Sequence, residues 1–140
     1  MTPRRPVAAV GVVCLRGDAV LMIQRGCAPL RGHWSLPGGK IEWGERAADA
    51  AMRELTEETG VAAELLGLID VVDGLFLGAG ESSHYVLVDY AARWTSGEPV
   101  AGDDAAQALF VPIDELSPLD LWPETMRIIL EAHARFGGAG

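Results

Sequence analysis

Basic residues are scarce in this chain, which has 11 lysines and arginines against 20 aspartates and glutamates in 140 residues. The formal net charge is −9 at pH 7, and the sequence pI is about 4.6. Nucleic acids and anionic membranes are bound mainly by basic surface patches. The composition therefore argues against both as main partners. An anionic small molecule would have to be met locally, by metal ions or by a few arginines.

Cysteine is equally rare. Cys14 and Cys27 are the only two, and they do not form a C-x-x-C pair. This argues against a disulfide framework and against a zinc site. We expect two buried or unreactive thiols in a protein of the reducing cytoplasm.

Long hydrophobic runs are absent, and none approaches the length of a membrane span. Residues 6–15 follow Arg4 and Arg5 in a way that superficially resembles a secretory signal. The run is too short, however, and it is rich in valine and lacks a small-x-small cleavage site. We therefore predict a buried strand here and no membrane partner.

Strand and helix patterns alternate along a chain that is long enough for one domain with a real core. Extended segments are predicted at residues 7–15, 19–24, 61–72, 83–94 and 105–112, with the first two forming an antiparallel hairpin. Helices are predicted at 45–59 and 123–136, and loops at 25–33, 73–81 and 95–104. This order predicts a single α/β domain over residues 1–140, with a mixed sheet between helices.

Each predicted helix has an apolar stripe. The first stripe consists of Ala48, Ala51, Met52 and Leu55, and the second of Met126, Ile129, Leu130 and His133. Gly60 is placed to end the first helix in a left-handed conformation.

Three glutamates, Glu54, Glu57 and Glu58, stand at positions i, i+3 and i+4 of the first predicted helix. This spacing places them close together on one side, where like charges cost a few tenths of a kcal/mol per pair. A hard divalent cation is the usual compensating ligand for such a cluster. The plainer alternative is a solvated charged face in which Arg53 pairs with Glu57.

The context of these glutamates resembles the signature of the Nudix (MutT-like) hydrolase family, G-x5-E-x7-R-E-U-x-E-E-x-G-U, in which U is bulky and aliphatic. The matching residues are Gly39, Glu45, Arg53, Glu54, Leu55, Glu57, Glu58, Gly60 and Val61. The resemblance implies the Nudix fold, in which a mixed β-sheet is sandwiched between helices in an α/β/α arrangement.

The resemblance also implies an enzyme that hydrolyses a nucleoside diphosphate linked to another group, with Mg²⁺ or Mn²⁺ as cofactor. By motif position, the implied metal ligands are Glu54, Glu57, Glu58 and the carbonyl oxygen of Gly39. Arg53 would complete the catalytic group by orienting a carboxylate, with Glu57 as its first candidate partner. Glu45 would hold the preceding loop to the helix.

Several roles stay open at this point. The general base is Glu54 or, as the next candidates, Asp103 and Asp104, which also fit a simple turn. Arg25 and Arg31 are the candidates for binding substrate phosphates. Trp34, Phe76, Tyr85 and Trp122 could stack on a base, although such residues more often belong to a core.

The substrate also has alternatives. Residues 102–116 resemble the corresponding region of small ADP-ribose pyrophosphatases, which favours ADP-ribose or a related nucleoside diphosphate sugar. Many such enzymes carry a proline about sixteen residues beyond the motif, where this chain has Leu75-Phe76-Leu77. A MutT-type hydrolase that cleaves (d)NTPs is the second candidate, and a nucleotide-sensing binding domain is the third. Many relatives are homodimers, and no segment of the sequence defines an interface.

Overall fold

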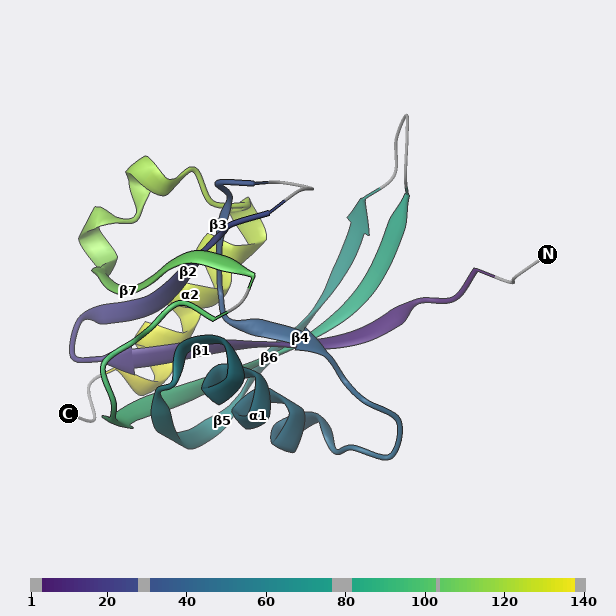
Figure 1. Ribbon diagram of the computed structural model, residues 1–140, viewed down its shortest axis with the longest axis horizontal. Helices are drawn as coiled ribbons and strands as arrows, with labels where there is room; N and C mark the ends of the chain where they lie inside the picture. Colours follow the sequence, from purple (N-terminus) through teal and green to yellow (C-terminus); the bar gives the residue numbers. More distant parts are fainter. Residues whose placement is uncertain (1–3, 28–30, 77–81, 103, 138–140) are drawn as a thin grey trace.

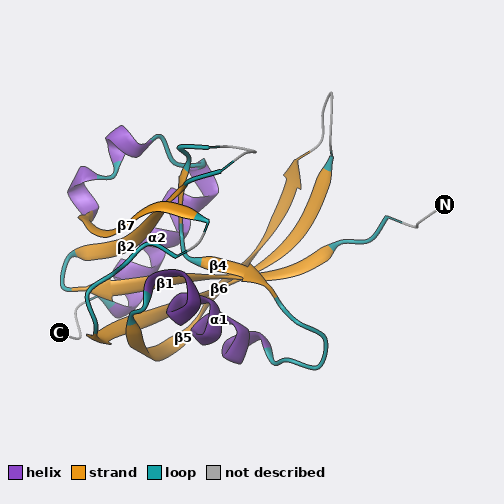
Figure 2. Cartoon of the chain, viewed as in Figure 1, coloured by secondary structure: helices purple, strands orange, loops and turns teal. Residues whose placement is uncertain are grey.

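The computed structural model describes residues 4–27, 31–76, 82–102 and 104–137, and its elements are drawn in Figures 1 and 2. The strands are β1 (Val7–Arg16), β2 (Ala19–Arg25), β3 (Trp34–Ser35), β4 (Gly38–Lys40), β5 (Ala62–Phe76), β6 (Ser83–Ser96) and β7 (Ala105–Pro112). The α-helices are α1 (Ala47–Thr59) and α2 (Pro123–Phe136), and two short 3-10 helices, η1 (Ile113–Glu115) and η2 (Ser117–Leu119), precede α2. The described residues contain no helix that is both long and apolar enough to cross a membrane.

The strands form one mixed sheet in the order β3-β2-β1-β6-β5, with β4 also pairing with β1 and β7 with β2. The pairing of β1 with β6 is parallel, and the remaining pairings are antiparallel. The two α-helices cover opposite faces of this sheet (Figure 2). The predicted α/β class and the α/β/α arrangement are therefore confirmed.

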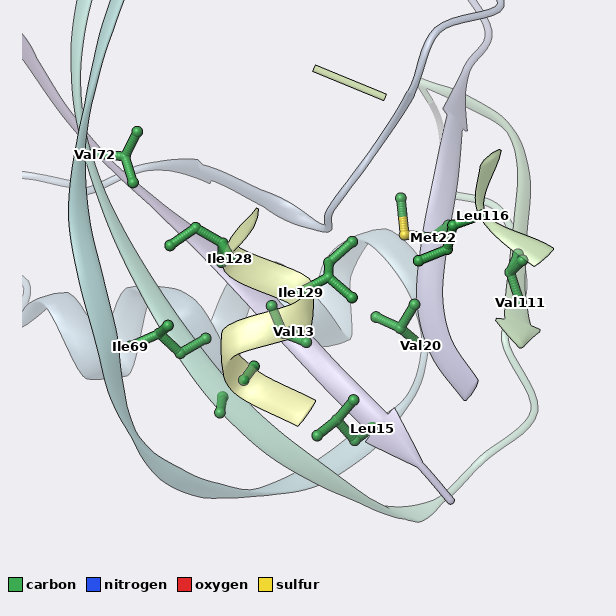
Figure 3. Packing of buried hydrophobic residues seen from close by; sticks show 12 residues of the cluster. Val13, Leu15, Val20, Met22, Ile69, Val72, Val111, Leu116, Ile128 and Ile129 are labelled. Atoms are coloured by element: carbon green, nitrogen blue, oxygen red, sulfur yellow. The ribbon is translucent and has the colours of Figure 1, made fainter. Parts of the chain in front are cut away.

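Strand β1 is buried on both faces, as its run of apolar residues predicts. Successive side chains of a strand point to opposite faces. Val13 and Leu15 accordingly belong to the core on the α2 side, part of which is shown in Figure 3. Val12 and Cys14 belong to the core on the α1 side, against Leu55. This central strand thus fixes both helices relative to one another.

The predicted ranges of β7 and α2 agree with the structure at both ends. The first helix begins at Ala47, two residues later than predicted. Its end agrees, because Gly60 adopts φ 72° and its N–H bonds the carbonyl of Thr56 at 2.8 Å. The prediction of a loop from residue 73 is wrong for residues 73–76, which continue β5, while residues 77–81 lie outside the described chain.

The buried face of α2 differs from the predicted stripe. Ile128, Ile129 and Ala132 are buried, whereas the side chain of Leu130 is 49% exposed. Successive residues of an α-helix are about 100° apart around its axis. With Ile129 at the centre of the buried face, Leu130 is rotated toward solvent, so its placement in the stripe was wrong.

This face supports a stability prediction. We expect Ile129→Ala to lower the free energy of unfolding by about 2–5 kcal/mol, because Ile129 is fully buried and truncation leaves a cavity. Leu130→Ala is the matched control and should change the unfolding free energy by about 0.5 kcal/mol or less. Urea denaturation followed by circular dichroism measures both. Equal effects of the two substitutions would contradict the observed orientation of α2.

Candidate active site

Strand β4 and helix α1 bring the two halves of the glycine-glutamate motif together. The Gly38 N–H donates a hydrogen bond to Glu58 Oε1 at 3.0 Å. A β-carbon added at Gly39 would lie 2.6 Å from the carboxyl carbon of Glu54, so any larger residue here would displace that carboxylate. The glycine at position 39 therefore allows the backbone of β4 to lie directly against the acidic face of α1.

Arg53 is the centre of an ion-pair network on this face. Its guanidinium holds Glu45 through two hydrogen bonds, Nε to Oε2 at 2.7 Å and Nη2 to Oε1 at 2.9 Å. Its Nη1 donates to Glu54 at 2.9 Å and to Glu57 at 3.2 Å, and Nη2 also donates to the carbonyl of Lys40 at 3.2 Å. One arginine thus joins α1, β4 and the intervening loop.

Glu45 is the main partner of Arg53, with Glu54 and Glu57 as further partners. Hydrogen bonds from Arg53 and from the Glu42 N–H lower the pKa of Glu45 to about 2. Glu45 therefore stays ionised and holds the loop to the helix, in agreement with the expected structural role. Sequence reasoning gave Glu57 as the first partner of Arg53, and the two hydrogen bonds to Glu45 add a stronger one.

The electrostatics of Glu58 show an excess of negative charge at this site. Burial raises the pKa of Glu58, and together with the nearby charges of Glu54 and Asp104 it brings the pKa to about 8 against the lowering effect of the Gly38 N–H. A carboxylate in such surroundings is stabilised by a nearby cation. The set of carboxylate and carbonyl oxygens is the type that Mg²⁺ and Mn²⁺ prefer. The residues present therefore fit a divalent cation.

The described residues do not by themselves form a closed cage, since no group of three or more His, Cys, Asp or Glu side chains within them is arranged to hold a metal. Arg53 keeps one oxygen each of Glu54 and Glu57 in hydrogen bonds. Side chains would have to turn for all three glutamates to bind one ion. The side chain of Glu57 has room to do so, because it is 60% exposed.

A cavity of about 490 Å³ lies beside these glutamates. Glu54, Glu57 and Glu58 line it from α1, Arg25 lines it from the end of β2, and Asp104 lines it from the segment before β7. Arg31 is exposed and is not among the residues that line it. Asp103 lies outside the described residues. The structure therefore brings Arg25 and Asp104 to the glutamates and leaves Arg31 apart from them.

The aromatic candidates separate in a similar way. Tyr85 and Trp122 line a second cavity that adjoins the first, whereas Trp34 packs against the core on the α2 side. Phe76 ends β5, and its side chain lies outside the described part of the structure. Sequence reasoning missed Asp89, a buried acid that lines the same second cavity. The available signal was a single acid in the middle of an apolar strand.

The mixed sheet, the acidic face of α1 and the glycine-bearing strand β4 together form an oxygen-rich site at one cavity. Comparison with known proteins identifies the family. The model of the NUDIX domain matches residues 5–132. The chain therefore belongs to the NUDIX domain family.

Three relatives place the chain within this family. It is 32% identical over 114 residues to the ADP-ribose pyrophosphatase of Methanocaldococcus jannaschii, covering 81% of this chain and 66% of that protein. It is 37% identical over 110 residues to the putative 8-oxo-dGTP diphosphatase 2 of Mycobacterium tuberculosis, covering 78% and 75%. The crystal structure of a MutT NUDIX hydrolase from Burkholderia pseudomallei has a TM-score of 0.80 and 33% identity, covering 91% of this chain and 98% of that one.

The chain spans only part of the length of several curated relatives. It covers 66% of the M. jannaschii protein, and 41% and 58% of two other curated relatives. Proteins of the family generally need divalent metal ions, which is compatible with the carboxylate and carbonyl oxygens at this site.

The network around Arg53 supports a second prediction. We expect Arg53→Lys to lower turnover by about 10–100-fold, since lysine cannot hold Glu45 through two parallel hydrogen bonds while also contacting Glu54 and Glu57. Steady-state kinetics at saturating metal measures the effect, with circular dichroism to verify folding. Arg93→Lys is the control and should keep full turnover, because it changes only an exposed pair between Arg93 on β6 and Glu64 on β5. Undiminished turnover in Arg53→Lys would contradict the orienting role.

Proposed function

We propose that this chain is a metal-dependent hydrolase that cleaves a phosphoric anhydride bond in a nucleoside diphosphate linked to another group. The observation that carries the proposal is the convergence of Glu54, Glu57 and Glu58 on one cavity with Arg25 and Asp104. Phosphoryl transfer depends on aligned groups and neutralised charge more than on a covalent catalyst. A cavity lined by several acids and an arginine supplies the elements that this chemistry needs.

The proposed cation ligands are Glu54, Glu57, Glu58 and the carbonyl oxygen of Gly39. When bound, Mg²⁺ or Mn²⁺ would supply the positive charge that phosphate oxygens require. Arg53 keeps the carboxylates of Glu54 and Glu57 oriented through its hydrogen bonds. Arg25, which lines the same cavity from the end of β2, contributes a guanidinium for a phosphate.

Glu54 is our first candidate for the general base. Its side chain is only 16% exposed, and Arg53 holds one of its oxygens in a hydrogen bond of 2.9 Å. Asp104 is the second candidate, because it lines the same cavity and lies on a separate segment of the chain. Asp103 stays a prediction outside the described residues. Arg31 also stays a sequence prediction for phosphate binding, without support from the cavity.

Two substrate types have support. ADP-ribose or a related nucleoside diphosphate sugar is favoured by residues 102–116 and by the name of the M. jannaschii relative. A (d)NTP is favoured by the name of the M. tuberculosis relative. Three further points stay predictions from the sequence. They are a single domain over residues 1–140, a cytoplasmic location and a possible homodimer.

The decisive experiment incubates the purified protein with ADP-ribose, NADH, diadenosine tetraphosphate and dNTPs, each with Mg²⁺ or Mn²⁺, and separates the products by chromatography. We expect hydrolysis of at least one substrate at an anhydride bond, and its loss in excess EDTA. AMP from ADP-ribose identifies the first type, and pyrophosphate from dNTPs identifies the second. Tight nucleotide binding without hydrolysis of any of them would replace the proposal with the nucleotide-sensing domain.

A further inference from the structure

A second cavity, of about 440 Å³, adjoins the cavity that the glutamates line. Both cavities are lined by Arg25, Ser35, Leu36 and Gly38, so they lie directly beside one another. The second part lies on the sheet face that α2 covers, between β1, β6 and the first turn of α2. A nucleotide with phosphates at the glutamates would place the rest of the molecule in this second part.

Asp89 is a buried acid at the floor of the second cavity. Its residue is only 6% exposed, and among the described residues it is the one charged side chain in the buried class. A β-carbon added at Gly11 would lie 2.3 Å from Asp89 Oδ1, so the carboxylate lies directly over that glycine of β1. The glycine creates the space that the carboxylate occupies.

The surroundings of Asp89 do not compensate its charge. Within the described residues no hydrogen bond to its carboxylate is found, and apolar Val72 and Leu87 line the same cavity. The charged groups that act on it are Asp70, which raises its pKa, and Arg127, which lowers it. Arg127 already donates hydrogen bonds to Asp70 and to Glu124. Burial in these surroundings is the main reason that the pKa of Asp89 rises to about 6.

A buried carboxylate without a partner is unfavourable unless something binds it. The oxygens of Asp89 are not fully enclosed, because the side chain lines an open cavity and no completely buried polar atom of the described residues lacks a partner. A ligand in the cavity can therefore reach them. The rings of Tyr85 and Trp122 also line this cavity, which makes it suitable for a flat aromatic ligand.

We propose that the second cavity binds the nucleobase of the substrate and that Asp89 selects a base with two adjacent N–H groups, as on the ring edge of guanine. The inference rests on the proposed function, because the nucleotide is the substrate class of the adjoining site. An ionised carboxylate only accepts hydrogen bonds, and it can accept two in parallel. Guanine offers a ring N–H beside an amino group, whereas adenine offers an amino group beside a ring nitrogen that is itself an acceptor.

The two bases therefore leave the site in different states. Guanine satisfies both oxygens of Asp89 with charge-assisted hydrogen bonds. Adenine satisfies one oxygen and places a ring lone pair against the other. Sites built around a hydrogen-bonding group reject ligands that leave it unpaired far more strongly than they reject changes of size. The preference would apply to a triphosphate and to a diphosphate sugar alike. Within the proposed substrate class it would therefore rank a guanine-linked sugar above ADP-ribose.

The test uses substrate pairs that differ only in the base, GTP with ATP and GDP-glucose with ADP-glucose, in the presence of Mg²⁺. For wild type, kcat/KM should be about 10²-fold or more higher for the guanine member of a hydrolysed pair. Asp89→Asn should raise KM for that member at least about tenfold with little change in kcat, because the amide presents one donor and one acceptor. Its adenine activity should stay equal or rise. Asp70→Asn is the matched control and should keep the wild-type base preference.

Equal kcat/KM for both members in wild type, or an unchanged ratio in Asp89→Asn, would overturn the assignment while leaving the proposed hydrolase intact. If no pair is hydrolysed, the substrate panel described above still decides the proposed function, and calorimetric binding of GMP and AMP decides the base assignment separately. Preferential GMP binding that Asp89→Asn abolishes would support it. Equal binding of GMP and AMP, or binding of neither, would overturn it.

Discussion

Glu57→Gln is expected to lower kcat by about 10²–10⁴-fold while leaving the fold intact. A cation at a phosphoryl group stabilises the transition state by several kcal/mol, and each 1.36 kcal/mol corresponds to a factor of ten in rate. Glutamine keeps the size of glutamate but removes the charge that a divalent cation needs. The side chain of Glu57 is 60% exposed, so its replacement removes little packing. Steady-state kinetics over a range of Mg²⁺ concentrations measures the loss.

Because the side chain of Glu57 is exposed, Glu57→Gln should change turnover without a large change in stability. Arg53 holds Glu57 through one hydrogen bond of 3.2 Å, an exposed i, i+4 pair whose loss costs about 0.5 kcal/mol or less. The thermal midpoint should therefore stay within a few degrees of wild type. Glu115→Gln, in the exposed turn η1, is the charge-matched control and should keep full turnover. Full turnover in Glu57→Gln, or in wild type with excess EDTA, would exclude the metal mechanism.

Local signals in the sequence predicted the elements that build the acidic face. Gly60 ends α1 in the left-handed conformation, and Pro123 begins α2, so the boundaries at these two residues were predictable from the chain itself. The spacing of Glu54, Glu57 and Glu58 placed them on one helix. The match of the motif to a known family then supplied the arrangement of β4 against that helix, which no local rule contains.

Features that depend on distant partners were not predictable in this way. Strand β5 continues through residues 73–76 because β6 pairs with it up to Phe76 and Ser83, despite the glycine at position 74. The doubly bonded pair of Arg53 with Glu45 depends on the path of the loop between β4 and α1. From the sequence alone, Asp89 resembles an ordinary polar residue of a strand. Its burial becomes evident only when β1 is seen to pair with β6, with Gly11 opposite Asp89.

The second large effect concerns the stability of the protein as a function of pH. We expect Asp89→Asn to raise the free energy of unfolding at pH 8 by up to about 3 kcal/mol, and much less at pH 4. The pKa of Asp89 rises from 3.8 to about 6 on folding, mainly through burial, and 1.36 kcal/mol corresponds to one pKa unit. Asparagine carries no charge, so its burial does not include the free-energy cost of removing a charge from water.

The direction with pH follows from proton binding. Below about pH 3.8 the carboxyl is protonated in both states, and burial costs no charge. Between 3.8 and about 6 the folded state binds the proton more strongly than the unfolded state, so wild-type stability falls as pH rises through this window. Above about pH 6 the cost is complete. The difference between Asp89→Asn and wild type should therefore grow from pH 4 to pH 7 and then stay constant.

Urea denaturation of both proteins across this pH range gives the difference, because groups that do not interact with position 89 titrate alike in the two chains. Asp114→Asn removes an exposed acid and should show a small difference that does not follow the same curve. A difference for Asp89→Asn that does not vary with pH would show that the carboxylate is compensated in solution. A gain in stability together with a loss of base preference would instead show why the acid is present, since the group that weakens the empty protein is then the group that recognises its ligand.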